Sequence, residues 1–123
     1  MKTILIIDDS SSLRRIVHEA LNILQFNILE AGNAEEAMAV LKVTSVDLLI
    51  LDWHMPGMDG FDLFLSLRDN PQYTNIPVIM LTNLGTEDDK LKGKKMGAAD
   101  YLIKASLTPG QISDRVKEIL KIK

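Results

Sequence analysis

The sequence predicts an α/β fold in which a parallel sheet of five strands is covered by helices on both faces. Five short β-rich runs alternate with segments of helical periodicity along the whole chain, which is the pattern of repeated βα units. Several of these runs are almost continuously apolar, as expected for strands that are buried on both faces. With 123 residues, the chain has the size of one domain. We therefore predict a single domain over residues 1–123.

The first βα unit begins at the N-terminus. Residues 3–8, TILIID, are the first predicted strand. Ser10 or Ser11 can cap the helix that follows. Apolar residues then recur at spacings of three and four, which is typical of an amphipathic helix. They are Leu13, Ile16, Val17, Ala20, Leu21 and Leu24. Residues 27–31, NILEA, are the short second strand.

Two further segments complete the middle of the chain. Asn33 is the predicted N-cap of the second helix, and Glu36 three residues later forms a variant of the capping box. Residues 46–51, VDLLIL, are the third strand, and residues 61–69 have helical periodicity. These assignments place Asp52 directly after a buried strand.

The last two units carry clear start signals. Residues 76–82 are the fourth strand, with Pro77 at its start, where a missing N–H is tolerated. Thr86 and the three acids after it mark a helix N-terminus, because acidic side chains complement the helix dipole there. Residues 99–104 are the fifth strand, and TPGQ at 108–111 provides an N-cap, a first-turn proline and a glutamine for the last helix.

The composition excludes several classes of protein. A net charge of −3 gives no reason to expect binding to nucleic acid or to an anionic membrane. The absence of cysteine excludes disulfides, thiolate chemistry and cysteine-ligated zinc. The first apolar run is too short for a signal peptide, and no run approaches the roughly 20 residues of a membrane span. We therefore expect a cytoplasmic protein.

Chemically suitable side chains stand where four of the five strands end. Asp8 and Asp9 end the first strand, Asp52 the third, Thr82 the fourth and Lys104 the fifth. In open α/β sheets, ligands bind at the carboxyl ends of the strands. Gathered carboxylates repel one another, and a divalent cation such as Mg²⁺ or Ca²⁺ removes that conflict. Carboxylate, metal, ammonium and hydroxyl together suit a phosphoryl group, which an aspartate can accept as an aspartyl phosphate.

Each of these residues also has an ordinary structural interpretation. The two N-terminal acids could simply cap a helix, and Asp52 could be a turn acid. Lys104 could be a solvated lysine and Thr82 a β-branched strand residue. The coincidence at four strand ends favours the functional interpretation over four independent accidents.

The same residues resemble a known family. Asp8-Asp9, LDWHMPGMDG at 51–60, Thr82 and DYLIK at 100–104 are similar to the motifs of the response-regulator receiver domain of two-component signalling, as in chemotaxis regulators. The likeness covers the whole chain. It implies a flavodoxin-like, doubly wound sheet in the strand order 2-1-3-4-5 with five helices.

The resemblance also implies a role for each acid. Asp52 would accept a phosphoryl group from a phosphohistidine of a sensor histidine kinase. Asp9 and Asp52 would ligate Mg²⁺ directly, together with the backbone carbonyl of His54. Asp8 would act largely through a metal-bound water.

The remaining motif residues would form the switch. Lys104 would pair with one phosphoryl oxygen, and Thr82 would move to hydrogen-bond another. Tyr101 would swing inward into the space that Thr82 leaves. This change would alter the surface formed by helix 4, strand 5 and helix 5, which would bind a downstream protein partner. We accordingly expect a signalling switch whose catalysis is limited to phosphoryl uptake and slow autodephosphorylation.

Three positions depart from the family pattern. Ala105 follows the lysine where the family usually has proline, and a cis bond before Ala costs about 2.5–4 kcal/mol. The sequence leaves open whether the Lys104–Ala105 peptide is cis or trans. Asn83 replaces a usually small residue after the threonine, and Leu84 cannot orient an attacking water, which favours slow loss of the phosphoryl group.

Alternatives from other classes are weaker. The main alternative is a Mg²⁺-dependent phosphatase that forms an aspartyl phosphate. Phosphatases of the haloacid-dehalogenase type need the motif Asp-x-Asp after strand 1, and Asp8-Asp9-Ser10 does not match it. A flavodoxin-like cofactor binder would need a phosphate-binding loop where two aspartates stand. A pseudo-receiver is disfavoured by the complete acid, threonine and lysine set. The initiator Met and the fit of the motifs favour a stand-alone regulator over an excised domain.

Two other side chains are expected to have structural rather than catalytic positions. Trp53 is expected to be a partly exposed packing residue that can report metal binding through its fluorescence, because it follows Asp52. His18 is expected on the surface of the first helix.

Overall fold

The computed structural model describes residues 1–21, 26–53, 60–82, 91, 93–95, 97–103 and 108–121, with Thr82 described by its backbone only. Its sheet has five strands in the order β2-β1-β3-β4-β5, and every neighbouring pair is parallel. The strands are β1 (Lys2–Ile7), β2 (Phe26–Ala31), β3 (Leu48–Asp52), β4 (Val78–Thr82) and β5 (Asp100–Ile103). The predicted strand order is therefore confirmed.

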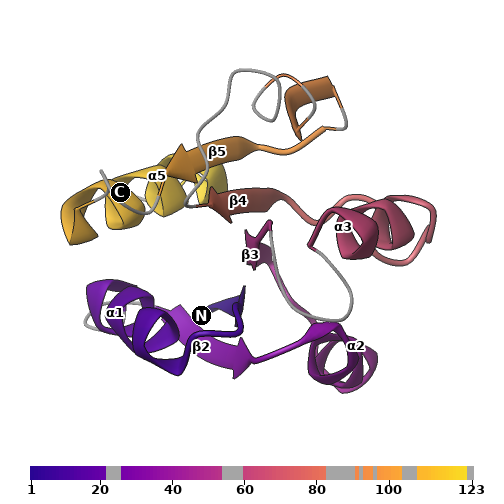
Figure 1. Cartoon of the computed structure of the whole chain (residues 1–123), viewed down its shortest axis with the longest axis horizontal. Helices are drawn as coiled ribbons and strands as arrows, with labels where there is room; N and C mark the ends of the chain where they lie inside the picture. The colour runs from indigo at the N-terminus through magenta and orange to yellow at the C-terminus, as the bar shows by residue number, and fades with distance from the viewer. Residues whose placement is uncertain are drawn as a thin grey trace.

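Helices cover both faces of the sheet, as predicted. They are α1 (Ser11–Leu21), α2 (Ala34–Val43), α3 (Gly60–Arg68) and α5 (Pro109–Leu120). In Figure 1 the sheet is seen with α1 and α5 on one side and α2 and α3 on the other. The predicted helix start at Thr86 lies outside the described residues. Helical backbone at residues 91 and 93–95 belongs to a further helix between β4 and β5. The doubly wound, flavodoxin-like architecture is confirmed.

Alternate residues of the continuously apolar strands pack into two separate hydrophobic cores, one on each face of the sheet. Leu5 and Leu49 belong to the core under α2 and α3, whereas Ile4 and Ile50 belong to the core under α1 and α5. Successive side chains of a strand point to opposite faces, so a strand between two layers of helices must be apolar at every position.

Helix caps agree with the sequence in two places. Thr108 and Gln111 form a complete capping box, since each side chain accepts from the other's backbone N–H. Asn33 accepts from the Glu36 N–H at 2.8 Å, while Glu36 Oε1 accepts from Gly32 N–H at 3.3 Å. The second box is thus a variant in which the Glu36 side chain accepts from the N–H of Gly32, one residue before the N-cap Asn33.

Two element bounds differ from the prediction in ways that bear on function. β3 extends to Asp52, because this residue still pairs with Leu81 of the neighbouring strand. The helix α3 begins at Gly60 rather than at residue 61. Both bounds therefore lie at the same edge of the sheet.

Arg68 joins three segments at the C-terminal end of α3. Its Nη1 donates to the carbonyls of Thr74 and Ile76 at 3.1 Å, and its Nη2 donates to the Gly97 carbonyl at 3.4 Å. Its guanidinium lies 4.6 Å from the centroid of the Phe64 ring. Burial lowers the pKa of Arg68 from its ordinary value, but arginine remains charged at neutral pH.

We expect Arg68→Met to lower the free energy of unfolding by about 2–3 kcal/mol, because part-buried carbonyls lose a charged donor. Urea unfolding measures this change. The matched control is Arg115→Met. The Arg115 side chain is 51% exposed and forms ion pairs of 3.5 and 3.6 Å, so its loss should cost less than about 1 kcal/mol. Equal losses in both variants would contradict a specific role for the Arg68 contacts.

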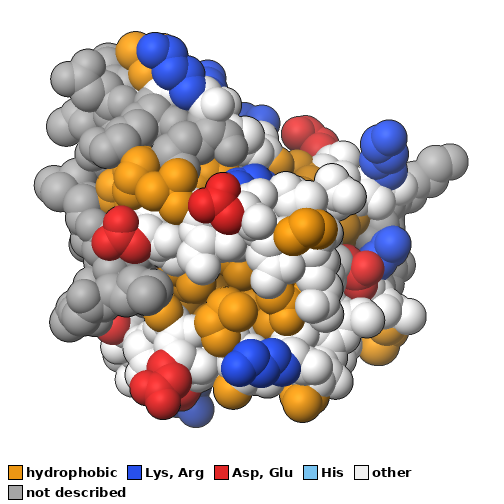
Figure 2. Space-filling model, turned by 90° about the vertical axis from the view of Figure 1, so that its right-hand side faces the viewer, with side chains coloured by type: hydrophobic (Ala, Val, Ile, Leu, Met, Phe, Trp, Pro, Cys, Tyr) orange, Lys and Arg blue, Asp and Glu red, His pale blue; other side chains and the backbone are white. Residues whose placement is uncertain are grey.

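Some apolar side chains remain on the surface. Figure 2 shows the side of the molecule that lies to the right in Figure 1, where hydrophobic side chains gather between scattered charged ones. Val43 is 83% exposed and Leu65 41% exposed. Within the described residues, the helices are all too short or too polar to span a membrane.

Candidate functional site

The carboxyl ends of β1 and β3 lie side by side. Ile7 pairs with Leu51 in the parallel register, so Asp8 and Asp52, the next residues, stand at the same level of the sheet. The chain leaves β1 toward α1 and leaves β3 toward α3. The sheet therefore brings the acids of the first and third βα junctions to one place.

Three carboxylates meet there. One oxygen from each of Asp8, Asp9 and Asp52 lies within 4.8 Å of the other two. Asp8 is 1% exposed and Asp52 4% exposed, whereas Asp9 is exposed. An ion from solvent would meet the Asp9 carboxylate first and the two buried carboxylates beneath it.

The turn after β1 holds Asp8 in place. Its N–H donates to the Ala31 carbonyl at 3.1 Å, and its Oδ1 accepts from the Ser10 N–H at 2.8 Å. Ser10 Oγ accepts in turn from the Leu13 N–H at 3.2 Å, so Ser10, not Ser11, caps α1. One short segment thus ends a strand, orients an acid and starts a helix.

The donor set fits a small divalent cation. Carboxylates this close together repel one another, and a cation between them offsets that repulsion. Mg²⁺ prefers oxygen ligands and typically takes one or two carboxylates, with waters and phosphate oxygens completing its shell. Asp8, Asp9 and Asp52 provide hard oxygen ligands at two depths, which meets that requirement.

The other predicted residues are only partly described. β4 ends at Thr82, which pairs with Ile103 at the end of β5, and Lys104 follows Ile103 in the sequence. The Thr82 backbone therefore lies at the same edge as the acids. The expected roles of His54 and Lys104 lie outside the described residues, as do the questions raised by Asn83, Leu84 and Ala105.

Aromatic side chains link the end of β3 to β5. Trp53 is 3% exposed and Tyr101 6% exposed, and their ring centroids lie 5.8 Å apart in an edge-on arrangement. Trp53 also packs against Phe61 of α3 at 5.2 Å. A Cβ at Gly93 would lie 3.2 Å from Tyr101 Cδ2, so this glycine lets the helical segment close over the pair. The expectation that Trp53 is partly exposed is wrong, because α3 and the segment with Gly93 cover it.

Sequence reasoning missed several residues around the acids. Arg14 donates to the Asp8 carbonyl at 2.6 Å and to Glu30 at 3.1 Å. The His18 side chain is 37% exposed, and its Nδ1 lies 2.9 Å from Glu30 Oε2. The Gly60 N–H donates to the Trp53 carbonyl at 2.9 Å. The spacing of Arg14 and His18 on one helix face was visible, but their partner on β2 was not.

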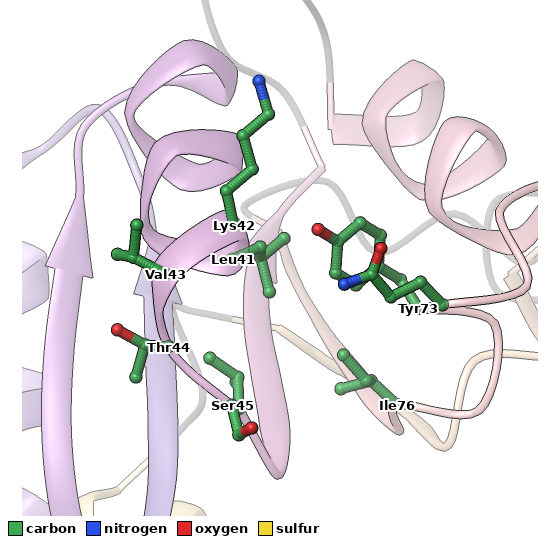
Figure 3. Close-up of a pocket in the computed structure, with 9 residues that line it drawn as sticks. Leu41, Lys42, Val43, Thr44, Ser45, Tyr73 and Ile76 are labelled. Atoms are coloured by element: carbon green, nitrogen blue, oxygen red, sulfur yellow. The ribbon is translucent and has the colours of Figure 1, made fainter.

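A separate groove lies at the opposite edge of the sheet. It has a volume of about 320 Å³ and lies between the end of α2 and the segment that precedes β4. In Figure 3, Leu41 and Lys42 stand on one side of it and Tyr73 and Ile76 on the other. Because this groove adjoins the amino ends of β3 and β4, it does not belong to the acid cluster.

Comparison with known proteins points to one family. Residues 4–117 match the family model described as the response regulator receiver domain. The solved structure of the chemotaxis response regulator CheY4 of Vibrio cholerae superposes with a TM-score of 0.87 at 30% identity, over 97% of this chain and 98% of that chain. The receiver domain of the Francisella response regulator 1452 gives 0.89 at 28% identity, over 98% of both chains.

Curated relatives are longer proteins. The phosphate regulon transcriptional regulatory protein PhoB of Pseudomonas aeruginosa is 39% identical over 120 residues, which are 98% of this chain and 52% of that protein. The transcriptional regulatory protein CpxR of Klebsiella pneumoniae is 40% identical over 121 residues, 98% of this chain and 50% of that protein. The chain thus spans about half the length of these relatives.

Proposed function

Because this chain belongs to the response regulator receiver domain family of two-component signalling, we propose that it is switched by phosphorylation of Asp52. The observation that carries this proposal is the meeting of three carboxylates, from the ends of β1 and β3, within 4.8 Å of one another. Asp52 is the acid that ends the central strand β3, so a rigid element presents it. The phosphoryl group comes from a phosphohistidine of a sensor histidine kinase.

The transfer is a direct displacement at phosphorus. A carboxylate oxygen of Asp52 attacks, and the bond from phosphorus to the imidazole nitrogen breaks as the new bond to oxygen forms. The electron pair of the broken bond stays on the imidazole, which takes up a proton. Burial of the Asp52 side chain removes competing water from around the nucleophile and holds it in one orientation.

Asp9, the second oxygen of Asp52 and the backbone carbonyl of His54 would hold Mg²⁺, and Asp8 would act largely through a water. When bound, the ion supplies positive charge that offsets the carboxylates and the incoming phosphoryl oxygens. Asp8 keeps its carboxylate in place through its bond from the Ser10 N–H.

Thr82 and Lys104 bind the phosphoryl group once it is on Asp52. Lys104 pairs with one phosphoryl oxygen, and the Thr82 hydroxyl donates to another. Phosphorylation adds nearly two negative charges and three strong acceptors, and a ligand shifts a two-state equilibrium by its difference in affinity for the two states. A tenfold shift needs about 1.4 kcal/mol, which one new charge-assisted hydrogen bond can supply.

Tyr101 carries the change toward the surface. Its ring is already buried against Trp53, so the switch is a change in this packing rather than a swing from an exposed position. The Thr82 backbone pairs with Ile103 of the same strand as Tyr101, which gives a movement at Thr82 a route to β5. The face formed by the helix before β5, β5 itself and α5 then changes its affinity for a downstream protein. We place these events in the cytoplasm, where the kinase domain would meet the receiver.

The phosphoryl group is lost slowly by hydrolysis. Leu84 is apolar and cannot orient an attacking water. Disappearance of the phosphorylated form after removal of the donor measures this rate, and equal lifetimes in wild type and Leu84→Glu would contradict the role of Leu84.

A small phosphodonor with Mg²⁺ should add one phosphoryl group to the protein, as measured by intact mass. Chelation of Mg²⁺ with EDTA should abolish the addition, because the carboxylates then repel the donor. The proposal fails if the chain takes up no phosphoryl group in Mg²⁺. Repeated turnover of a generic phosphomonoester would instead support the alternative of a Mg²⁺-dependent aspartyl-phosphate phosphatase.

A further inference from the structure

A half-buried guanidinium contacts the backbone of the acid cluster. Arg14, on the first turns of α1, donates from Nη1 to the Asp8 backbone carbonyl at 2.6 Å. The carbonyl of Asp8 and the N–H of Asp9 belong to the same planar peptide unit. A bond to this carbonyl therefore constrains the orientation of the backbone between two of the three acids.

Glu30 of β2 holds the guanidinium in that position. Arg14 Nε donates to Glu30 Oε1 at 3.1 Å, while His18 Nδ1 lies 2.9 Å from Glu30 Oε2. Arg14 and His18 stand one turn apart on α1 and meet the two oxygens of a single carboxylate. The Arg14 side chain is only 19% exposed, so its position is set by these partners more than by solvent.

The chain leaves room for this arrangement at Gly32. A Cβ there would lie 3.3 Å from Arg14 Nη1 and 3.1 Å from Glu36 Oε1. Both distances are shorter than ordinary van der Waals contact. The residue that follows β2 is thus small at the place where the guanidinium passes.

We propose that Arg14, fixed by Glu30, is a positioning residue for the Mg²⁺ site, because it orients the Asp8–Asp9 peptide and so sets where both carboxylates point. Arg14 acts through Asp8 and Asp9 and does not itself touch the ion. Partners that orient ligands in this way have large effects on metal affinity. The inference rests on the proposed function, which assigns Mg²⁺ to this cluster.

Glu30 has a second effect, through charge. An uncompensated guanidinium one peptide away from the ligands would repel a divalent cation. The Glu30 carboxylate offsets that charge, and the guanidinium still donates to the Asp8 carbonyl. Loss of the geometry and loss of the counter-charge should therefore both weaken Mg²⁺ binding.

Arg14→Lys tests the geometry at constant charge, since a single ammonium cannot reproduce the planar fork that reaches both partners. Titration with Mg²⁺ alone, followed by the fluorescence of Trp53, the one tryptophan, should show a Kd about tenfold higher than in wild type. Glu30→Gln should raise the Kd by a smaller factor, because the amide keeps an acceptor oxygen. Backbone order parameters at residues 8–10 without Mg²⁺ should fall in Arg14→Lys.

Arg15→Lys is the matched control, because it makes the same change one residue away on the exposed side of the helix, and its Kd should equal that of wild type. A purely structural role for Arg14 would lower the urea midpoint and leave the Mg²⁺ Kd unchanged, which would overturn the inference. Failure of wild type to bind Mg²⁺ would overturn the proposed function. Normal binding by both wild type and Arg14→Lys would overturn only the inference.

Discussion

Asp52→Asn should abolish phosphorylation by a small phosphodonor in Mg²⁺, with a rate reduced roughly 10³-fold or more, equivalent to about 4 kcal/mol of activation free energy. The amide has nearly the shape of the carboxylate but lacks its negative charge and nucleophilic oxygen. Because Asp52 is 4% exposed at the end of the central strand, the substitution removes a nucleophile that the fold holds in one place. Intact mass after exposure to the donor measures the loss.

Asp62→Asn is the appropriate control. Asp62 is an exposed acid in the first turn of α3 and does not belong to the cluster of Asp8, Asp9 and Asp52. It should be phosphorylated at the wild-type rate on Asp52. A phosphoryl group on Asp52→Asn, located by peptide mapping on Asp8 or Asp9, would move the acceptor to the first strand.

Gly60→Ala should destabilise the fold and disable the site together. A Cβ at this position would lie 1.8 Å from the Asp52 carbonyl oxygen and 2.8 Å from the Asp52 carbonyl carbon. Both atoms are backbone, so α3 and the end of β3 must separate by more than an ångström. We expect a loss of about 3 kcal/mol in the free energy of unfolding and roughly a 10²-fold slower phosphorylation, because misplacement by 1 Å has that cost.

Gly110→Ala is the matched control, since it also adds a methyl group in the first turn of a helix. Its nearest neighbour would be Thr108 Oγ1 at 4.0 Å. The gain in helix propensity, up to about 1 kcal/mol, should leave this variant as stable as wild type or more so. Urea unfolding and the rate of phosphoryl addition distinguish the two variants, and equal behaviour would refute a special role for Gly60.

Elements with local causes could be predicted well. The apolar runs at 3–8 and 46–51 became β1 and β3, and the Thr108–Gln111 capping box begins α5 as expected. The errors lie where distant segments meet. The sequence shows that Trp53 follows an acid, but its burial depends on Phe61 and Tyr101, which pack on it from another helix and another strand.

The candidate site divides in the same way. Side chains that follow strands reach one edge of any parallel sheet, so Asp8, Asp9 and Asp52 could be grouped before their distances were known. The guanidinium of Arg14 could not be added to the group. Its partners are a carbonyl six residues earlier and a carboxylate on β2, and helical periodicity does not encode either contact.

The amino-acid sequence by itself determined the succession of strands and helices along the chain, the apolar character of both faces of the sheet and the edge at which the acids lie, because periodicity and chain direction act locally. The tertiary structure alone decided which carboxylates come within 4.8 Å, that Gly60 must lack a side chain to pass the Asp52 carbonyl, and that Glu30 holds Arg14 behind Asp8. Those facts depend on the register of β1 with β3 and on the packing of helices against them. Register and packing are properties of pairs of segments that meet only in the folded chain.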